Sequence, residues 1–353
     1  MEMDVYSFDP LQDPRWPELI GRHPNASVFH TSAWLQALQR TYHFTPIAFT
    51  TSRPTGELKN ALVVADIRSR LTGRRLVSLP FSDHCEPLVD SLEEFRALCS
   101  SVLRRRAQGH WRYVEMRPAS STIPFEESLL GIGFQRTQTF FLHRLDLRPD
   151  LDALLHSFHK DSIQRKIRRA ERERLTYEEG RSDALLRKLY HLLDLTRRRH
   201  QVPLQPLAWF RNLIEGFGDN LCIRIASKDG QPAAGILTIA HGNSVVYKYG
   251  GSQTSLHPLG GMPFLFWKTI RDAKQMGARE LDLGRSDHNN TGLILFKEHL
   301  AAKHSTLTYW RSPGETRSTS EDGWKMRLAR RAFAGLPDGI RRTAGSFLYR
   351  HIG

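Results

Sequence analysis

The stretch that decides the fold is residues 229–252, DGQPAAGILTIAHGNSVVYKYGGS. Two apolar runs flank the triplet His241-Gly242-Asn243, a pattern that indicates two antiparallel strands joined by a tight turn. Residues 260–277, GGMPFLFWKTIRDAKQMG, then carry apolar side chains at helical spacing and end in Gly277, which is typical of a helix C-terminus. Two strand-like runs, ARELDLG (278–284) and STLTYWRS (305–312), complete an α+β unit with the order hairpin, helix, strand, strand.

The same order of elements is predicted earlier in the chain. Its predicted elements are a hairpin (GELKNALVVADIRSR, 56–70, and RRLVSLPFS, 74–82), a helix (SLEEFRALCSSVLRRRA, 91–107) and two strands (WRYVEMRP, 111–118, and GFQRTQTFFLHRLDL, 133–147). The chain is therefore expected to be of the α+β class, with two tandem copies of one unit. Each copy is expected to hold a mixed, largely antiparallel sheet flanked by helices.

The domain boundaries follow from this repeat. We expect a first domain at residues 1–150, a basic connecting helix at 151–180, a second domain at 181–312 and a basic tail at 313–353. In the connecting helix, Ile163 and Ile167 form a thin docking stripe among cations, so the segment is either a solvated linker or a surface that faces an anion. The tail has amphipathic basic segments that suit an anionic membrane surface or pack back on the protein.

Composition narrows the possible functions. The 353 residues have a net charge of +14, which favours polyanionic partners such as tRNA, a phosphate-bearing cofactor or an anionic membrane. No apolar run reaches membrane-spanning length and no secretory leader is recognisable, so we expect a cytoplasmic protein, peripheral at the inner face of the membrane if the tail binds there. The three cysteines form no CxxC pair, and no HExxH, GxSxG or Walker motif occurs. No metal cofactor is therefore predicted.

Residues 247–273 are the clearest candidate for a binding site. A strand with Tyr247 and Tyr249 precedes a turn rich in glycine and then an amphipathic helix. Glycines before a helix N-terminus let backbone N–H groups approach a phosphate, and the helix dipole favours the anion. Because the two tyrosines alternate along a strand, they are expected to share one face, where plain sheet packing is the alternative to ligand binding.

These motifs carry a resemblance to a known family. The chain has a strand end with YGGS (249–252), then a Gly-Gly loop, a helix, the strand ELDLGR (280–285) and the motif GLILFK (292–297). This order of motifs resembles the FemAB-like branch of the GNAT acyltransferase superfamily. That branch includes peptidoglycan interpeptide-bridge aminoacyltransferases and acyltransferases associated with exopolysaccharide genes. The basic segment 162–180 and the segment 195–215 are similar to the same family. The resemblance covers about residues 20–312, and the tandem domains of the family agree with the internal repeat.

The resemblance implies transfer of an acyl group from a phosphate-bearing donor to an amine. The lysine of the family's Phe-Lys pair, Lys297 here, is expected to hold the acyl carbonyl or the tRNA end. The resemblance also implies that Tyr249, Arg198 and Arg199 bind the phosphate-bearing acceptor and that Trp34 lines the same cleft. Leu259, Gly260 and Gly261 are expected to hold the pyrophosphate of a thioester donor, and Tyr247 is a further candidate for substrate binding.

Two departures bear on the donor. The basic segment is too short for the coiled-coil insertion of the bridge-forming enzymes, which weakens the tRNA interpretation. The loop SLHPLGG (255–261) offers Ser255 and His257 where the pyrophosphate signature has Arg or Gln, which weakens the coenzyme A interpretation. The first hypothesis is an N-acyltransferase that uses acyl-CoA or acyl carrier protein and an amine of a cell-envelope or exopolysaccharide precursor. The alternatives are an aminoacyl-tRNA-dependent enzyme and a non-catalytic, membrane-associated scaffold.

The turn after residue 281 holds the remaining candidates. Acyl transfer to an amine needs a proton acceptor and stabilisation of the carbonyl oxygen. Asp282 and Asp287 are candidates for the first role, Lys297 for the second and Arg285 for substrate binding. The structural alternatives are a salt bridge of Asp282 with Arg285, a helix cap at Asp287 and a surface position for Lys297.

Overall fold

The computed structural model describes residues 3–69, 72–119, 124–314 and 349–351. The predicted basic tail lies almost wholly outside the described residues. The described chain divides into two compact units. The first is formed by residues up to Phe140 together with residues 306–314 and 349–351, and the second by Phe141–Ser305. Within the described residues, no helix is both long enough and apolar enough to cross a lipid bilayer.

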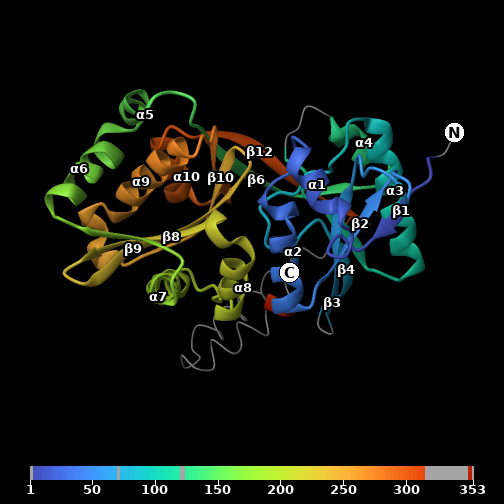
Figure 1. Ribbon diagram of the computed structural model, residues 1–353, viewed down its shortest axis with the longest axis horizontal. Helices are drawn as coiled ribbons and strands as arrows, with labels where there is room; N and C mark the ends of the chain where they lie inside the picture. The colour runs from blue at the N-terminus through green and yellow to red at the C-terminus, as the bar shows by residue number, and fades with distance from the viewer. Residues whose placement is uncertain (1–2, 70–71, 120–123, 315–348, 352–353) are drawn as a thin grey trace. The chain divides into compact units, whose positions relative to one another are not determined.

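The first unit is a mixed sheet with helices packed on it (Figure 1). Its strand order is β1-β2-β3-β4-β5-β12-β6, in which β4 and β5 run parallel and the pairs β1/β2, β2/β3, β3/β4 and β5/β12 run antiparallel. Its elements are β1 (Tyr6–Phe8), α1 (Arg15–Arg22), α2 (Ser32–Tyr42), β2 (Thr45–Thr50), β3 (Leu62–Ser69), β4 (Gly73–Val77), α3 (Leu92–Gln108), β5 (Tyr113–Met116), α4 (Phe125–Gly131) and parts of β6 (Gln135–Asp146) and β12 (Lys303–Ser312).

The sheet of the second unit has the strand order β6-β11-β10-β9-β8-β7. Helices α7 and α8 lie on one face of this sheet, and α5, α6, α9 and α10 lie on the other (Figure 1). Its elements are α5 (Leu151–Ser157), a π-helical turn (Lys160–Gln164), α6 (Arg165–Arg172), β7 (Thr176–Gly180), α7 (Asp183–Arg199), α8 (Leu207–Phe217), β8 (Leu221–Lys228), β9 (Gln231–His241), β10 (Ser244–Ser252), the 3₁₀-helix η4 (Thr254–Leu259), α9 (Gly261–Gln275), β11 (Glu280–Ser286) and α10 (Thr291–His299).

The predicted repeat is present in the structure. In the first unit the antiparallel pair β3/β4 leads into α3, and β5 then returns parallel to β4. In the second unit the antiparallel pair β9/β10 leads into α9, and β11 returns parallel to β10. The hairpin turn falls between His241 and Ser244 as predicted, and Gly277 follows α9 with a φ of 79°. The α+β prediction is confirmed.

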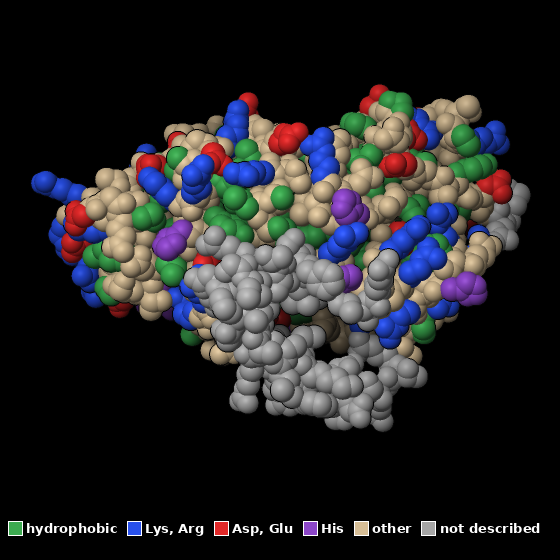
Figure 2. All heavy atoms as spheres, turned by 90° about the horizontal axis from the view of Figure 1, so that it is seen from below, with side chains coloured by type: hydrophobic (Ala, Val, Ile, Leu, Met, Phe, Trp, Pro, Cys, Tyr) green, Lys and Arg blue, Asp and Glu red, His purple; other side chains and the backbone are tan. Residues whose placement is uncertain are grey.

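The basic segment predicted as a single connecting helix is part of the second unit. It forms α5, the π-helical turn, α6 and the edge strand β7, which pairs antiparallel with β8. Ile163 and Ile167 are buried in the core of the unit beside residues of α9 such as Leu265 and Ile270, so the predicted docking stripe is confirmed. The cations of α6 remain outside this core. On the face drawn in Figure 2, Lys and Arg side chains are spread among acidic ones.

Glycines allow β10 to lie close to its neighbours. A Cβ atom at Gly251 would come within 2.5 Å of the backbone carbonyl of Leu192 in α7. A Cβ atom at Gly250 would come within 2.1 Å of the hydroxyl of Tyr247. Because backbone atoms cannot move aside as a side-chain end can, Gly251 sets the distance between strand and helix. The glycines of the YGGS motif therefore have a packing role.

Candidate functional site

The candidate site of the second unit begins where β11 ends. The strand buries Leu281 and Leu283, while Gly284 adopts a φ of 70° and a β-bulge interrupts the pairing with β6 between Asp282 and Arg285. A positive φ is accessible to glycine without the steric cost that other residues meet. The bulge and Gly284 therefore turn the chain out of the sheet and toward α10.

Lys297 of α10 is buried beneath this turn. Its side chain is 2% exposed, and its Nζ donates to the carbonyl oxygens of Gly284 (2.8 Å) and Arg285 (3.1 Å) and to Oγ of Ser286 (2.9 Å). A surface position for this lysine is therefore wrong. An ammonium group has three protons, and these three acceptors use them all. The result is a positive charge held in a fixed place inside the protein.

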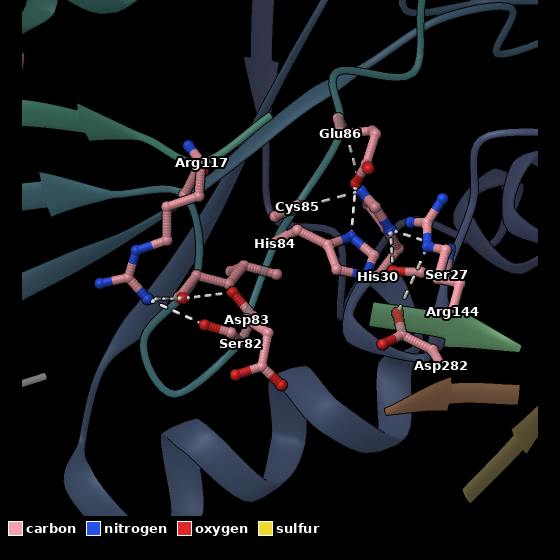
Figure 3. A network of polar contacts seen from close by, with 12 residues as sticks. Ser27, His30, Ser82, Asp83, His84, Cys85, Glu86, Arg117, Arg144 and Asp282 are labelled. Atoms are coloured by element: carbon pink, nitrogen blue, oxygen red, sulfur yellow. Dashed lines mark hydrogen bonds and ion pairs between the residues drawn. The ribbon is translucent and has the colours of Figure 1, made fainter. Parts of the chain in front are cut away.

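Asp282 holds the same turn from the other side. Asp282 is 3% exposed, and its carboxylate accepts the N–H of Gly284 at 2.6 Å. The carboxylate also lies 3.8 Å from Nε of Arg144. Figure 3 draws Asp282 beside Arg144. The N–H and the C=O of Gly284 are thus bound by an anion and a cation. Asp282 thus forms an ion pair with Arg144 of the neighbouring strand β6.

Asp287 does not cap the helix that follows it. The N-cap of α10 is Asn290, whose side chain accepts the N–H of Leu293 at 3.2 Å. The backbone carbonyl of Asp287 instead accepts the N–H of Asn290. The prediction of the cap is wrong because the helix begins at Thr291, too far along the chain for the Asp287 side chain to bond its first N–H groups. The carboxylate of Asp287 is exposed.

His143 of β6 joins this site, although no sequence pattern singled it out. Its ring is fully buried, Nδ1 lies 3.5 Å from Oγ of Ser286, and Nε2 has no hydrogen-bond partner among the described residues. Burial, followed by the charges of Lys297 and His304, lowers the pKa of His143 to about 4 although Asp282 opposes the shift. The imidazole is therefore neutral at neutral pH. A histidine inside an apolar strand carries no local signal of such neighbours.

The two tyrosines of β10 lie on opposite faces of the sheet, so the prediction that they share one face is wrong. A β-bulge at Lys248 makes Tyr247 and Tyr249 pair with consecutive residues of β9, which reverses the expected alternation. Tyr247 packs on Phe266 of α9, with ring centroids 4.8 Å apart. Burial raises the pKa of Tyr247 to about 12 despite the nearby charge of Arg197.

Tyr249 points into the layer formed by α7 and α8. Its ring packs on Phe210 with centroids 5.0 Å apart, and its hydroxyl accepts the indole N–H of Trp209 at 2.8 Å. Both partners belong to α8. Tyr249 thus has a packing role on the face opposite to Tyr247.

The glycine loop leads into an uncapped helix. Gly260 is the N-cap of α9, has a φ of 81° and provides no side-chain cap. It packs against α6, because a Cβ atom there would lie 2.2 Å from the carbonyl oxygen of Lys166, while Gly261 packs on Ala234 of β9. The side chain of Leu259 packs against the core of the unit. At Gly260 and Gly261 the backbone therefore approaches α6 and β9 closely.

Cations surround the loop. Arg199, at the end of α7, donates to Oγ1 of Thr254 in η4 at 2.7 Å. Burial lowers the pKa of His257, and the charges of Arg199 and Lys166 add to that shift. Arg198 instead pairs with Asp194 one helical turn earlier. Of the two predicted arginines, the structure brings Arg199 to the loop and shows Arg198 in an ion pair along its own helix.

Trp34 belongs to the first unit, where it is a core residue. Its side chain is fully buried in α2 and packs edge-on against Phe29, with ring centroids 4.9 Å apart. The same unit holds a polar network in which Nδ1 of His84 lies 2.8 Å from the carboxylate of Glu86 (Figure 3).

Comparison with known proteins agrees with this fold. Residues 157–291 match the family model described as an acetyltransferase (GNAT) domain. No curated protein matches the sequence significantly. Among solved structures, FemX is 14% identical with a TM-score of 0.68, and the similarity covers 87% of this chain and 97% of FemX. The predicted GNAT-like fold is thereby confirmed, with a GNAT-domain match over residues 157–291 and a FemX-like arrangement of the chain.

Two further solved structures share the fold. The C-terminal domain of a putative lysylphosphatidylglycerol synthetase from Agrobacterium fabrum is 15% identical with a TM-score of 0.56, covering 86% of this chain and 92% of that domain. A tandem GNAT protein from the clavulanic acid biosynthesis pathway is 14% identical with a TM-score of 0.55, covering 89% of this chain and 99% of that protein. The likeness to a tandem GNAT protein agrees with the repeat seen in the strand topology.

Proposed function

We propose that the protein transfers an acyl or aminoacyl group from a phosphate-bearing donor to an amine, with the reacting carbonyl placed beside the turn of residues 284–286. The observation that carries this proposal is the buried ammonium of Lys297. A fixed positive charge removed from water acts strongly on negative charge that develops nearby, because the medium around it screens little. The tetrahedral intermediate of acyl transfer places such charge on the former carbonyl oxygen.

The three hydrogen bonds of Lys297 define how it would act. It stabilises the oxyanion through its charge, or it exchanges the Ser286 hydroxyl, the one side-chain acceptor among the three, for the substrate oxygen. Asp282 is a positioning residue in this scheme, since its carboxylate is occupied by Gly284 and Arg144. Asp287 is exposed in the same turn and is the carboxylate able to receive the substrate ammonium.

The N-terminus of α9 supports a phosphate-bearing donor. The helix begins at Gly261 without a side-chain cap, and the cations Arg199 and Lys166 lie near the preceding loop. Unbonded N–H groups at a helix start attract phosphate, and nearby cations strengthen that attraction. We therefore propose acyl-CoA or another acyl thioester as the donor. An amine of a cell-envelope or exopolysaccharide precursor is the acceptor class that the family resemblance suggests.

Aminoacyl-tRNA is the second candidate donor, and α6 supports it. Lys166, Arg168 and Arg172 are exposed and form no ion pair with a carboxylate among the described residues. Arg165 and Arg169, in contrast, pair with acids of their own segment. Thiol release during turnover would identify the thioester. A steep fall of donor affinity with salt would identify tRNA, because neutralised phosphates release counterions.

The experiment that tests the site is Lys297→Met, assayed for acyl transfer with each donor. We expect kcat to fall by about 100-fold or more, the scale seen when a group that stabilises an oxyanion is removed. Lys160→Met, which removes an exposed lysine of the same unit, is the matched control and should keep its turnover. Circular dichroism and the melting temperature show whether the variant is folded. A folded Lys297→Met protein with undiminished turnover would refute the site, and absence of turnover in the wild type with both donors would favour a non-catalytic scaffold.

A further inference from the structure

Three metal-ligating side chains meet beside the turn of residues 284–286. His143 comes from β6, Glu298 from α10 and His304 from β12, which lies next to β6 in the sheet order. One ligand atom of each residue lies within 4.8 Å of the corresponding atoms of the other two. Two imidazoles and one carboxylate are thus brought together from elements that are distant in the sequence.

The cluster is closed on one side and open on the other. His143 is fully buried, whereas the side chains of Glu298 and His304 are 36% and 43% exposed. Nδ1 of His304 lies 3.2 Å from Oε1 of Glu298, and the ring of Phe141 packs on His304 with centroids 4.4 Å apart. An ion can therefore reach the cluster from solvent through the exposed pair and stop at the buried imidazole.

His143 provides an independent sign of a missing ligand. Its Nε2 is buried and has no hydrogen-bond partner among the described residues. A buried nitrogen without a partner destabilises the folded state, and a metal ion would satisfy it. The other ring nitrogen, Nδ1, faces Oγ of Ser286 at 3.5 Å. A partner on the second nitrogen is the arrangement that orients a metal-binding histidine.

We propose that the second unit binds one divalent transition-metal ion, Zn²⁺ in the first instance, through Nε2 of His143, the His304 imidazole and the Glu298 carboxylate. Two histidines and one carboxylate are a donor set of zinc sites that keep a fourth position open. Closure from the separations in the structure to bonds of about 2.0–2.2 Å needs side-chain rotation at the two exposed ligands.

The charges around the cluster permit a cation. The positive charge of Lys297 disfavours a bound cation, as it disfavours a proton on His143. Two carboxylates oppose that effect, Glu298 as a ligand and Asp282 through its action on the same imidazole. A bound metal would join β6, α10 and β12 and would order His143 beside Ser286. Metal binding can be measured without any substrate, so the result does not depend on the proposed acyl transfer.

The experiment uses the full chain without a histidine tag, freed of metal by a chelator and titrated with Zn²⁺ against a chromophoric competitor. We expect one equivalent to bind to the wild type. His304→Gln and Glu298→Gln, which change exposed side chains, should each weaken binding by at least about 10-fold. His156→Gln, which changes an exposed histidine of α5, should leave the affinity unchanged. Replacing Zn²⁺ by Co²⁺ should give visible absorption bands that His304→Gln removes.

Equal Zn²⁺ affinity in the wild type and His304→Gln would overturn the proposal. A wild-type titration in which the first equivalent of Zn²⁺ binds no more tightly than further equivalents would overturn it as well. His143→Asn tests the buried ligand and should abolish the Co²⁺ bands in a protein whose circular dichroism matches the wild type. If that variant fails to fold, His304→Gln and Glu298→Gln still decide the question.

Discussion

Gly251 shows how one residue couples a sequence motif to packing. The motif YGGS suggested a backbone that approaches a phosphate, yet the atoms nearest to a Cβ atom at Gly251 would be backbone atoms of Leu192 and Leu193 in α7. The N–H of the next residue, Ser252, donates to Oγ1 of Thr196 on the same helix. At the scale of the residue, glycine here sets the separation of β10 and α7.

Gly251→Ala should therefore destabilise the second unit by about 1–3 kcal/mol, the usual cost of forcing an extra methyl group into a packed interior. Gly292→Ala is the matched control, because nothing lies within 4 Å of its Cβ position and alanine favours a helix. Urea unfolding of the two variants measures both effects. If Gly251→Ala and the wild type have the same free energy of unfolding, β10 and α7 can move apart without loss of stability, and Gly251 does not set their separation.

Helix α10 is the element that supplies two of the candidate functions. Its residues Lys297 and Glu298 are adjacent, so their side chains diverge, one to the buried turn and the other to the half-exposed cluster with His304. The start of the helix fixes both directions. That start is set by Asn290, whose side chain bonds the N–H of Leu293.

Asn290→Ala should accordingly cost about 1 kcal/mol of stability, the usual loss on removing an N-cap, and should disturb Lys297 and Glu298 together. Asp287→Ala should leave stability nearly unchanged, because that side chain is exposed and caps nothing. Thermal unfolding of both variants distinguishes the two residues. A larger loss for Asp287→Ala than for Asn290→Ala would contradict the assignment of the cap.

At the scale of the whole molecule, local patterns predicted what depends on local sequence. Apolar spacing and turn glycines predicted both hairpins, the helices α3 and α9 and their repetition. The same patterns could not predict the bulge at Lys248 that places Tyr247 and Tyr249 on opposite faces, since the pairing with β9 decides it. Nor could they predict that His143 meets His304, because neighbours in a sheet are set by tertiary pairing of distant segments.

The first unit adds a charge network that spacing alone does not reveal. Glu115 is 3% exposed and binds Arg117 and Arg311, at 2.7 Å each. Burial by itself would raise the pKa of the Glu115 carboxyl, but the two guanidinium groups outweigh it and hold that pKa below its usual value. A depressed pKa in the folded state means that this carboxylate stabilises the fold above the pKa of the unfolded chain. The contribution is lost as the pH falls through the lower, folded value.

Glu115→Gln should therefore destabilise the first unit at neutral pH by about 3 kcal/mol, because two partly buried guanidinium groups lose their carboxylate. The difference from the wild type should shrink as the pH is lowered through the depressed pKa of Glu115, because the wild-type carboxyl then becomes protonated as well. Glu126→Gln, which breaks the exposed pair with Arg136, is the matched control and should cost less than about 1 kcal/mol. Calorimetric unfolding of the three proteins across this range measures the effect. If the stability lost in Glu115→Gln stays constant with pH, the packing of Glu115 and not its charge is important, because a loss of ion pairs must disappear once the wild-type carboxyl is protonated.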